Sequence, residues 1–452
     1  MCTWAEHEAA VARLKASYAR IPADQQVRLA KKTSNLFRPR ETTRTHGLDV
    51  SGLTDVIAID VEKQIADVQG MCTYEHLVDV TLRHGLIPTV VPQLRTITLG
   101  GAVTGLGIES TSLRLGLPHE SVIEMDVLTG SGDVVTATPT NEHAALFNAF
   151  PNSYGSLGYA VRLQISLQPA THYVELRHHL VPNALEAAAV IHEVARTGEF
   201  QGVRVDAIDG TVFSPREIYL TLAHFTNENG PVSDYTRHKI YYKSVQEIQR
   251  DRLTMHDYLW RWDTDWFWCS RAFGAQNPIA RRVWPRHLRR SDVYHRLVAL
   301  DSRIGARRVL DKLKGIAGRE RVVQDIEVPV ARLADFLDWF DTNIGMRPVW
   351  ICPLRTGRDW STYPLEPGEV YVNVGFWGTV EVPAESEPHR LNRMIEREVD
   401  RLGGHKSLYS ESFYPHDEFD RLYGTRQLDT LRETYDPQGR LKNLYDKTVR
   451  NQ

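Results

Sequence analysis

Over the first 170 residues, some stretches space their hydrophobic residues as strands do, and others space them as helices do. Val11, Leu14, Tyr18 and Ile21 recur at the spacing of one helix face, which predicts an amphipathic N-terminal helix. Apolar runs with polar or glycine boundaries predict strands over 55–60, 65–68, 121–128, 134–137 and 160–167, and helices over 74–84 and 142–149. This mixture predicts an α+β domain.

The pattern changes near residue 171. Further strands are predicted over 174–180, 203–208, 218–222, 322–328 and 370–376, and helices over 184–196, 330–340 and 389–402. The tail from 428 to 450 is helical in pattern, apart from a turn at 435–439. We therefore expect an N-terminal α+β domain over 1–170, a second α+β domain over 171–425, and a tail over 426–452.

The stretch 96–112, TITLGGAVTGLGIESTS, carries four glycines in a short distance, and a second glycine patch, YGSLG, follows at 154–158. Glycine lets backbone N–H groups come close to a ligand, and several such groups pointing into one concavity bind phosphate. One patch alone fits a surface turn equally well. Two patches around an apolar α/β segment favour loops that hold a diphosphate.

The partial G-x-G in 105–107 is not read as a dinucleotide-binding fingerprint. Ser110 stands at the place of the third glycine, and the preceding segment contains Pro88 and Pro92, which a central first strand would not tolerate. The remaining interpretation is a flavin fold in which several loops hold the diphosphate.

Composition limits the function further. The 452 residues have a net charge of -3, with 42% hydrophobic residues, which gives no general signal for nucleic acid. The four cysteines are far apart without a C-x-x-C pair, so we expect a reducing cytoplasm and assign no metal site. We expect no signal peptide, because the N-terminus lacks an apolar core region, and no apolar run approaches the ~18 residues of a membrane span.

TITLGGAVTGLGIESTSLRLGL and VLTGSGDVVTATPTNEHAALFNAFPNSYGSLGYAVRLQISLQPATHYVEL resemble the 24-dehydrocholesterol reductase (Diminuto-like) branch of the p-cresol methylhydroxylase-type FAD oxidoreductases. The resemblance continues through VVQDIEVPVARL, PVWICPL and VYVNVGFWG to LYDKTV. It implies a two-domain p-cresol methylhydroxylase/vanillyl-alcohol oxidase-type fold: an FAD-binding domain completed by the C-terminal tail, and an α+β substrate (cap) domain.

The same resemblance implies reduction of an isolated carbon–carbon double bond with NADPH. The bacterial subgroup that reduces 10-methylene fatty acyl chains to 10-methyl chains is similar, and it implies a methyltransferase partner. A sterol side-chain Δ24 reductase is the second interpretation. An FAD-dependent alcohol or sugar oxidase or dehydrogenase of the same fold is the third, and a flavin-free binding protein is the fourth. No nicotinamide signature distinguishes NADPH from NADH.

Many relatives tether the flavin through a histidine in an RGGGH-like loop. The matching region here, KTSNLF at 32–37, has no histidine, cysteine or glycine, so we expect non-covalent FAD. The candidate cofactor-binding residues are Lys32, Ser34, Asn35, Thr96, Gly100, Gly101, Gly105, Gly107, Ile108, Glu109, Ser110, Ser112, Gly155, Ser156 and Gly158. For Glu109 two roles stay open: contact with flavin or nicotinamide, or a carboxylate that accepts from nearby N–H groups.

Reduction of an unconjugated alkene needs a proton donor in a dry cleft. In the strand over 322–328, Asp325 and Glu327 lie on the face opposite the apolar even positions. A half-solvated sheet explains this pattern equally well, but the resemblance places this sheet against the flavin ring. Asp325 is therefore the first candidate acid, Tyr371 the second and Tyr409 the third.

The segment 258–290 combines tryptophans with arginines. Trp260, Trp262, Trp266, Trp268 and Trp284 are joined by Arg281, Arg282, Arg286, Arg289 and Arg290. Tryptophan favours the bilayer interface and clustered arginine attracts anionic headgroups, so one interpretation is peripheral contact with an anionic membrane, at its cytoplasmic face. The other is an aromatic core beside a solvated basic face. A lipid or fatty acyl substrate fits the interpretation of peripheral membrane contact. Nucleic acid is not an expected partner.

Overall fold

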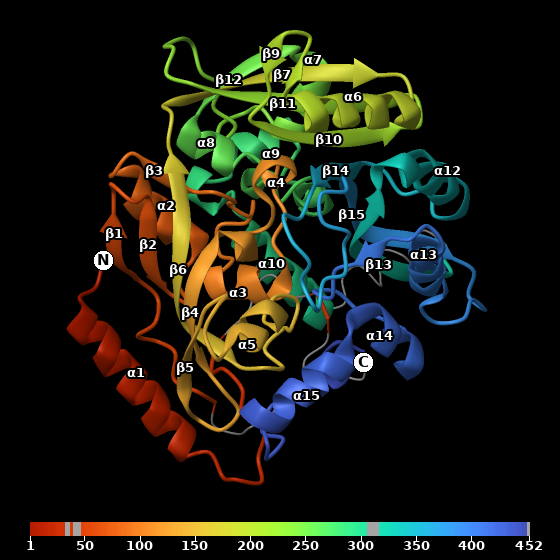
Figure 1. Cartoon of the computed structure of the whole chain (residues 1–452). Coiled ribbons are helices and arrows are strands. Elements are labelled where there is room, and N and C mark those ends of the chain that lie inside the picture. Colours follow the sequence, from red (N-terminus) through yellow and green to blue (C-terminus); the bar gives the residue numbers. More distant parts are fainter. Residues whose placement is uncertain (32–36, 39–46, 305–315, 450–452) are drawn as a thin grey trace.

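The computed structural model describes residues 1–31, 37–38, 47–304 and 316–449, with no side chains described for 298–304 (Figure 1). Two large antiparallel sheets organise these residues. The predicted Lys32, Ser34 and Asn35 lie outside the described residues.

The first sheet is formed by the N-terminal third of the chain. Its six strands are β1 (Val56–Asp60), β2 (Ile65–Gln69), β6 (Tyr159–Pro169), β4 (Val122–Leu128) and β5 (Val134–Ala137) in spatial order, with β3 (Leu86–Pro88) paired to the end of β6. The helices of this part are α1 (Trp4–Ala19), α2 (Tyr74–Leu82), α3 (Leu99–Gly105), α4 (Ser112–Leu115) and α5 (Ala144–Ala149). Alternate strand residues such as Val68, Met125 and Leu163 form its core.

The second sheet has eight strands. In spatial order they are β12 (Arg250–Thr254), β7 (Tyr173–Val181), β11 (Glu217–Thr226), β10 (Ala207–Ser214), β14 (Val349–Leu354), β15 (Tyr371–Val382), β13 (Gly318–Pro329) and β16 (His405–Lys406). Three helices cover one face: α6 (Ala184–Thr197), α12 (Leu333–Asn343) and α13 (Arg390–Arg401) (Figure 1). Ile191, Phe336 and Ile395 of these helices pack on Ile326 and Val374 of the sheet in one buried cluster.

Short elements complete the described part of the chain. They are the pair β8 (Glu199–Phe200) and β9 (Val203–Arg204), the 3₁₀ turns η1 (Pro118–Ser121), η2 (Asp263–Asp265), η3 (Cys269–Phe273), η4 (Arg286–Leu288) and η5 (Val330–Arg332), and the helices α7 (Tyr241–Glu247), α8 (Met255–Leu259), α9 (Pro278–Val283), α10 (Ser291–Ile304), α14 (His416–Tyr423), α15 (Thr425–Tyr435) and α16 (Leu444–Thr448).

The C-terminal tail returns to the N-terminal part. The Arg440 guanidinium donates to the backbone carbonyl of Ile21 at 3.1 Å, and the Lys447 ammonium donates to the carbonyl of Gly155 at 2.7 Å. The chain passes from the first sheet to the second between β6 and β7, at residues 170–172. These contacts are what the predicted tail requires, while the exact domain boundaries stay a prediction.

Comparison with the sequence patterns shows several differences. Strand β12, the helices α7 to α10 and the helix α14 were not predicted. The stretch predicted as a glycine loop contains the short helix α3, because the Thr98 hydroxyl accepts from the N–H of Gly101 at 3.3 Å and so starts a helical turn. Strand β14 was not predicted, because all six of its residues are buried and it shows no alternation. The predicted mixture of helices and sheets is confirmed.

Candidate functional site

A cavity of about 1170 Å³ is lined by residues from both large sheets. Ala160 of β6, Asp325 of β13 and Trp350 of β14 all contribute to its lining, together with Lys447 of α16. The volume exceeds the ~1,000 Å³ of large small-molecule pockets, so the cavity has room for a dinucleotide and a second ligand.

The two glycine patches meet on one side of this cavity. The N–H of Gly100 donates to the carbonyl of Gly70 at 2.9 Å, and a Cβ at Gly100 would lie 2.7 Å from that oxygen. The Tyr154 hydroxyl donates to the carbonyl of Gly105 at 2.9 Å, which joins the second patch to the first. Gly158 has a φ of +140°, which only glycine adopts readily. Glycine at these positions therefore lets the cavity wall pack closely against neighbouring backbone.

Cationic side chains from both ends of the chain line the same cavity. The Lys31 ammonium lies 3.2 Å from the Thr98 hydroxyl, and Lys447 binds the carbonyl of Gly155 in the second glycine patch. Arg28 and Lys442 also line the cavity. Sequence patterns did not single out these four residues, since they lie more than 400 positions apart in two groups and no local motif joins them.

These residues fit FAD. A diphosphate needs cations and a wall that it can approach closely, and the lysines and the glycine backbone supply both at one place in the cavity. The N–H groups of Gly100, Gly101 and Gly107 donate within the protein. Gln93 lines the cavity too, and its buried amide has no protein hydrogen-bond partner among the described residues, so it is free to bind a ligand. The predicted residues that line the cavity here are Thr96, Gly100, Gly101, Gly105, Gly107, Ile108, Gly155 and Gly158.

Four predicted cofactor residues are buried and do not line the cavity: Glu109, Ser110, Ser112 and Ser156. The buried Glu109 carboxylate accepts from the Arg261 guanidinium at 3.1 Å, and Arg261 also donates to Asp209 at 2.9 Å. The ion pair with Arg261 therefore holds the Glu109 side chain away from the cavity. Of the two expected roles, this position fits the carboxylate that accepts from nearby N–H groups, since Glu109 accepts from the Ser110 backbone N–H and from Arg261. It does not fit contact with flavin or nicotinamide, because Glu109 does not line the cavity.

Asp325 lines the cavity from β13, opposite Gly375 of β15. Its carboxylate accepts from the Asn373 amide at 3.1 Å and from the Tyr409 hydroxyl, and the Trp377 indole N–H donates to the Tyr409 oxygen at 2.8 Å. Burial raises the pKa of Asp325 to about 6, and the two donated hydrogen bonds oppose that rise. Two of the three candidate acids, Asp325 and Tyr409, are thus in direct contact.

Glu327, two positions along β13, is also buried. Burial and the neighbouring Asp325 charge raise its pKa well above the usual range, and its carboxyl accepts from the Ser407 hydroxyl at 3.1 Å. Glu327 does not line the cavity.

Tyr371, the second candidate acid, is placed elsewhere. Its hydroxyl accepts from the backbone N–H of Glu366 at 3.3 Å and does not line the cavity. Tyr371 lies at the start of β15 opposite Pro329, whereas the cavity lies at the Gly375–Trp377 end. The sequence pattern predicted a strand over 370–376 but did not show which end of it borders the cavity.

Aromatic rings form the remaining side of the cavity. Phe267 and Trp377 lie with their ring centroids 4.4 Å apart, Phe267 and Trp350 lie 5.6 Å apart, and Phe37 stacks on Trp266 at 5.9 Å. The acid therefore faces a largely apolar space. Such a space suits an apolar substrate and excludes water from a proton transfer.

The tryptophans expected at a membrane interface are part of this interior. Trp260, Trp262, Trp266 and Trp268 are all buried, so that expectation is wrong for these four residues. Arg281 and Arg289 are buried as well, and Arg290 forms an ion pair with Glu75 at 2.8 Å. Within the described ranges, each helix is too short or too polar to cross a bilayer.

Residues 4–138 match the family model of the FAD binding domain. The chain is 27% identical to the Delta(24)-sterol reductase of Homo sapiens over 427 residues, which covers 89% of this chain and 78% of the human protein. It is 23% identical to the Delta(24)-sterol reductase of Arabidopsis thaliana over 449 residues, or 89% of this chain and 76% of the plant protein. A shorter match, 34% over 125 residues, joins 28% of this chain to 22% of cytokinin dehydrogenase 10 of Oryza sativa subsp. japonica.

The match to the FAD binding domain covers α3 and the first glycine patch, which line the cavity with the lysines of the tail. The sterol reductase matches extend through the sheet that carries Asp325. Together these findings identify the chain as an FAD-dependent oxidoreductase that carries a p-cresol methylhydroxylase-type FAD-binding domain.

Proposed function

We propose that the protein reduces an isolated carbon–carbon double bond at a branched carbon of an apolar lipid, with non-covalent FAD and with NADPH as the reductant. One observation carries this proposal: a carboxylic acid with a pKa of about 6, Asp325, lies at the wall of an aromatic cavity that also has a cationic, glycine-lined side. An alcohol oxidase needs a base near its substrate, whereas an alkene reductase needs an acid.

FAD, when bound, supplies hydride transfer from a reduced nicotinamide to carbon. The protein supplies the proton. Asp325 donates its proton to the less substituted alkene carbon, and the π electron pair forms the new C–H bond. Positive charge then develops at the branched carbon, which must accept the hydride. The Asp325 carboxylate left behind is stabilised by the donors of Asn373 and Tyr409.

The surrounding residues position this acid and keep the site dry. Gly375 leaves the space that the Asp325 carboxylate uses, since a Cβ there would lie 2.3 Å from its oxygen. Trp377 fixes Tyr409 through the indole N–H, and it borders the same space. An alkene protonated here meets aromatic faces rather than water, and aromatic faces stabilise developing positive charge.

Two substrates meet these requirements. The names of the similar human and plant proteins favour a Δ24 double bond in a sterol side chain. The choice of a 10-methylene fatty acyl chain as the substrate rests on the sequence resemblance alone. Both present an alkene with a branched carbon in an apolar surrounding. An FAD-dependent alcohol or sugar oxidase or dehydrogenase of the same fold is the alternative that the sequence resemblance implies. The match of 125 residues to cytokinin dehydrogenase 10 favours a dehydrogenase but not an alcohol or sugar as its substrate.

A reconstitution experiment separates these activities. The purified chain is loaded with FAD and mixed anaerobically with NADPH or NADH, and bleaching of the flavin is followed. A Δ24-unsaturated sterol and a 10-methylene phospholipid are then supplied, and mass spectrometry looks for products heavier by two hydrogens. Bleaching by NADPH with a reduced lipid product supports the proposal. No bleaching by either nucleotide, with bleaching by an alcohol or sugar, refutes it.

A further inference from the structure

A surface patch lies on the short segment between η3 and α10. Ile279, Val283 and Leu288 are 75%, 79% and 36% exposed. Ile279 and Val283 are four positions apart on α9, so they lie on one side of the helix. We call this set, with the arginines described next, the α9–η4 surface. Large apolar side chains gathered on one exposed segment mark an interaction site.

The charge of this segment has one sign. Residues 266–291 contain six arginines and no aspartate or glutamate. Arg271, Arg282 and Arg286 are exposed, and none of them forms an ion pair with another described residue. They complete the α9–η4 surface, which is apolar and cationic. A partner with acidic groups and an apolar layer is complementary to it.

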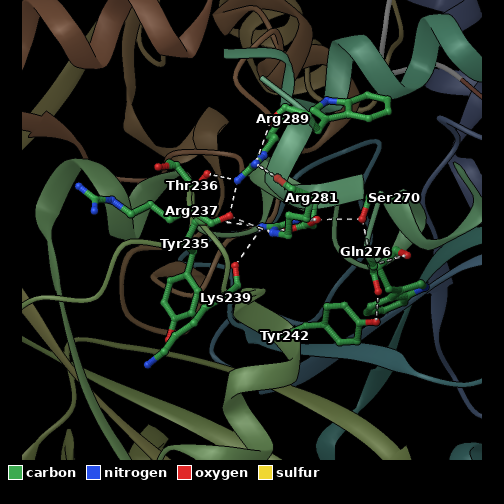
Figure 2. Close-up of polar contacts among 12 residues, drawn as sticks. Tyr235, Thr236, Arg237, Lys239, Tyr242, Ser270, Gln276, Arg281 and Arg289 are labelled. Carbon is green, nitrogen blue, oxygen red and sulfur yellow. Dashed lines mark hydrogen bonds and ion pairs between the residues drawn. The ribbon is translucent and has the colours of Figure 1, made fainter. Parts of the chain in front are cut away.

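Two other arginines of the segment point inward and hold it in place (Figure 2). Arg281 binds Asp265 at 2.7 and 3.0 Å, and it donates to the carbonyls of Arg237 at 3.0 Å and Lys239 at 2.9 Å. Arg289 donates to the carbonyl of Trp284 at 2.8 Å and to carbonyls of the 236–237 stretch.

Breaking a buried charge pair is strongly destabilising, so this hydrogen-bonded core fixes the orientation of the segment. Ile279 and Val283 cannot turn inward without disrupting it. The fold therefore keeps these apolar side chains exposed to solvent.

The segment is also connected to the cavity. Cys269 on one side of it, and Asp292 and His295 on the other, line the cavity described above. The α9–η4 surface thus lies on the stretch of chain between two cavity-lining stretches. The residues of this surface are therefore close in sequence to cavity-lining residues on either side.

We propose that the α9–η4 surface docks onto an anionic lipid bilayer. Ile279, Val283 and Leu288 insert at the level of the acyl chains, and Arg271, Arg282 and Arg286 bind the acidic headgroups. The proposal commits to a bilayer because the segment offers three separate apolar side chains among cations, which matches headgroups above hydrocarbon. It goes beyond the proposed activity and does not depend on it.

Vesicle flotation tests the proposal with the full chain loaded with FAD. Vesicles of phosphatidylcholine alone are compared with vesicles that also contain phosphatidylserine. We expect binding to the anionic vesicles that weakens with salt. The double variant Arg282→Gln/Arg286→Gln should lower the partition coefficient about thirtyfold, since each arginine near an anionic surface contributes about fivefold. The variant Ile279→Ser/Val283→Ser should reduce binding to both kinds of vesicle.

A matched control carries Leu185→Ser and Arg216→Gln. Leu185 is 69% exposed on α6, and Arg216 is exposed in the turn between β10 and β11, so neither belongs to the α9–η4 surface. This control should bind like the unchanged chain. Circular dichroism and flavin content verify that each variant is folded.

Three results would overturn the proposal. The first is a folded chain that does not float with anionic vesicles. The second is flotation that neither double variant reduces. The third is a dimer in analytical ultracentrifugation that Ile279→Ser/Val283→Ser converts to a monomer without any change in flotation, because a second copy of the chain would then cover this surface.

Discussion

Replacing Asp325 by asparagine separates the proposed acid from the rest of the site. The Asp325→Asn side chain has nearly the same shape and keeps an oxygen that accepts from Asn373 and Tyr409. It cannot donate a proton to carbon. We expect FAD binding and flavin reduction by NADPH to be unchanged, and alkene reduction to be lost.

The raised pKa of Asp325 sets the size of two effects: the pH dependence of kcat/KM and the pH dependence of the folding stability. With a pKa of about 6, the protonated fraction falls about tenfold for each pH unit above that value, so kcat/KM for the alkene should fall with it. The folded state also holds this proton more tightly than the unfolded chain. Stability is therefore lost as the pH rises from about 4 to about 6, and the loss of about 1–3 kcal/mol persists above.

Asp325→Asn removes that charge, so its melting temperature should exceed that of the unchanged chain at pH 8 and match it near pH 4. Asp338→Asn on the exposed side of α12 is the control and should change neither quantity. The assay is the pH profile of kcat/KM together with thermal unfolding. A variant that keeps alkene reduction, or an unchanged chain whose kcat/KM is flat from pH 5 to pH 8, would refute Asp325 as the proton donor.

Further substitutions test the other parts of the site. Gly100→Ala should lower the flavin content of the purified protein, because its Cβ would lie 2.7 Å from the carbonyl of Gly70; full flavin content would contradict the glycine-lined site. Gly375→Ala should displace the Asp325 carboxylate and lower kcat for the alkene while NADPH still bleaches the flavin; an unchanged kcat would contradict it. Arg261→Met should destabilise the fold by about 3–5 kcal/mol in denaturant unfolding, because two buried carboxylates lose their partner; a loss below ~1 kcal/mol would show that the ion pairs are not essential.

Sequence alone was informative where a property depends on neighbours in the chain. The alternation in 322–328 placed Asp325 on the face opposite Val322 and Ile326, and the structure has Val322 and Ile326 fully buried. The glycines of 100–107 and 155–158, which the sequence singled out, line the cavity. Periodicity and glycine content are local, so they are readable without knowing the fold.

Only the tertiary structure decided which residues meet. Lys31 and Lys447 come together in one cavity from opposite ends of the chain, and Tyr409 lies against Asp325, 84 positions away. Tryptophan is compatible with a membrane interface or a core, and packing against the cavity placed Trp266 in the core. Such contacts depend on how two sheets and a returning tail pack, and no local pattern encodes that packing.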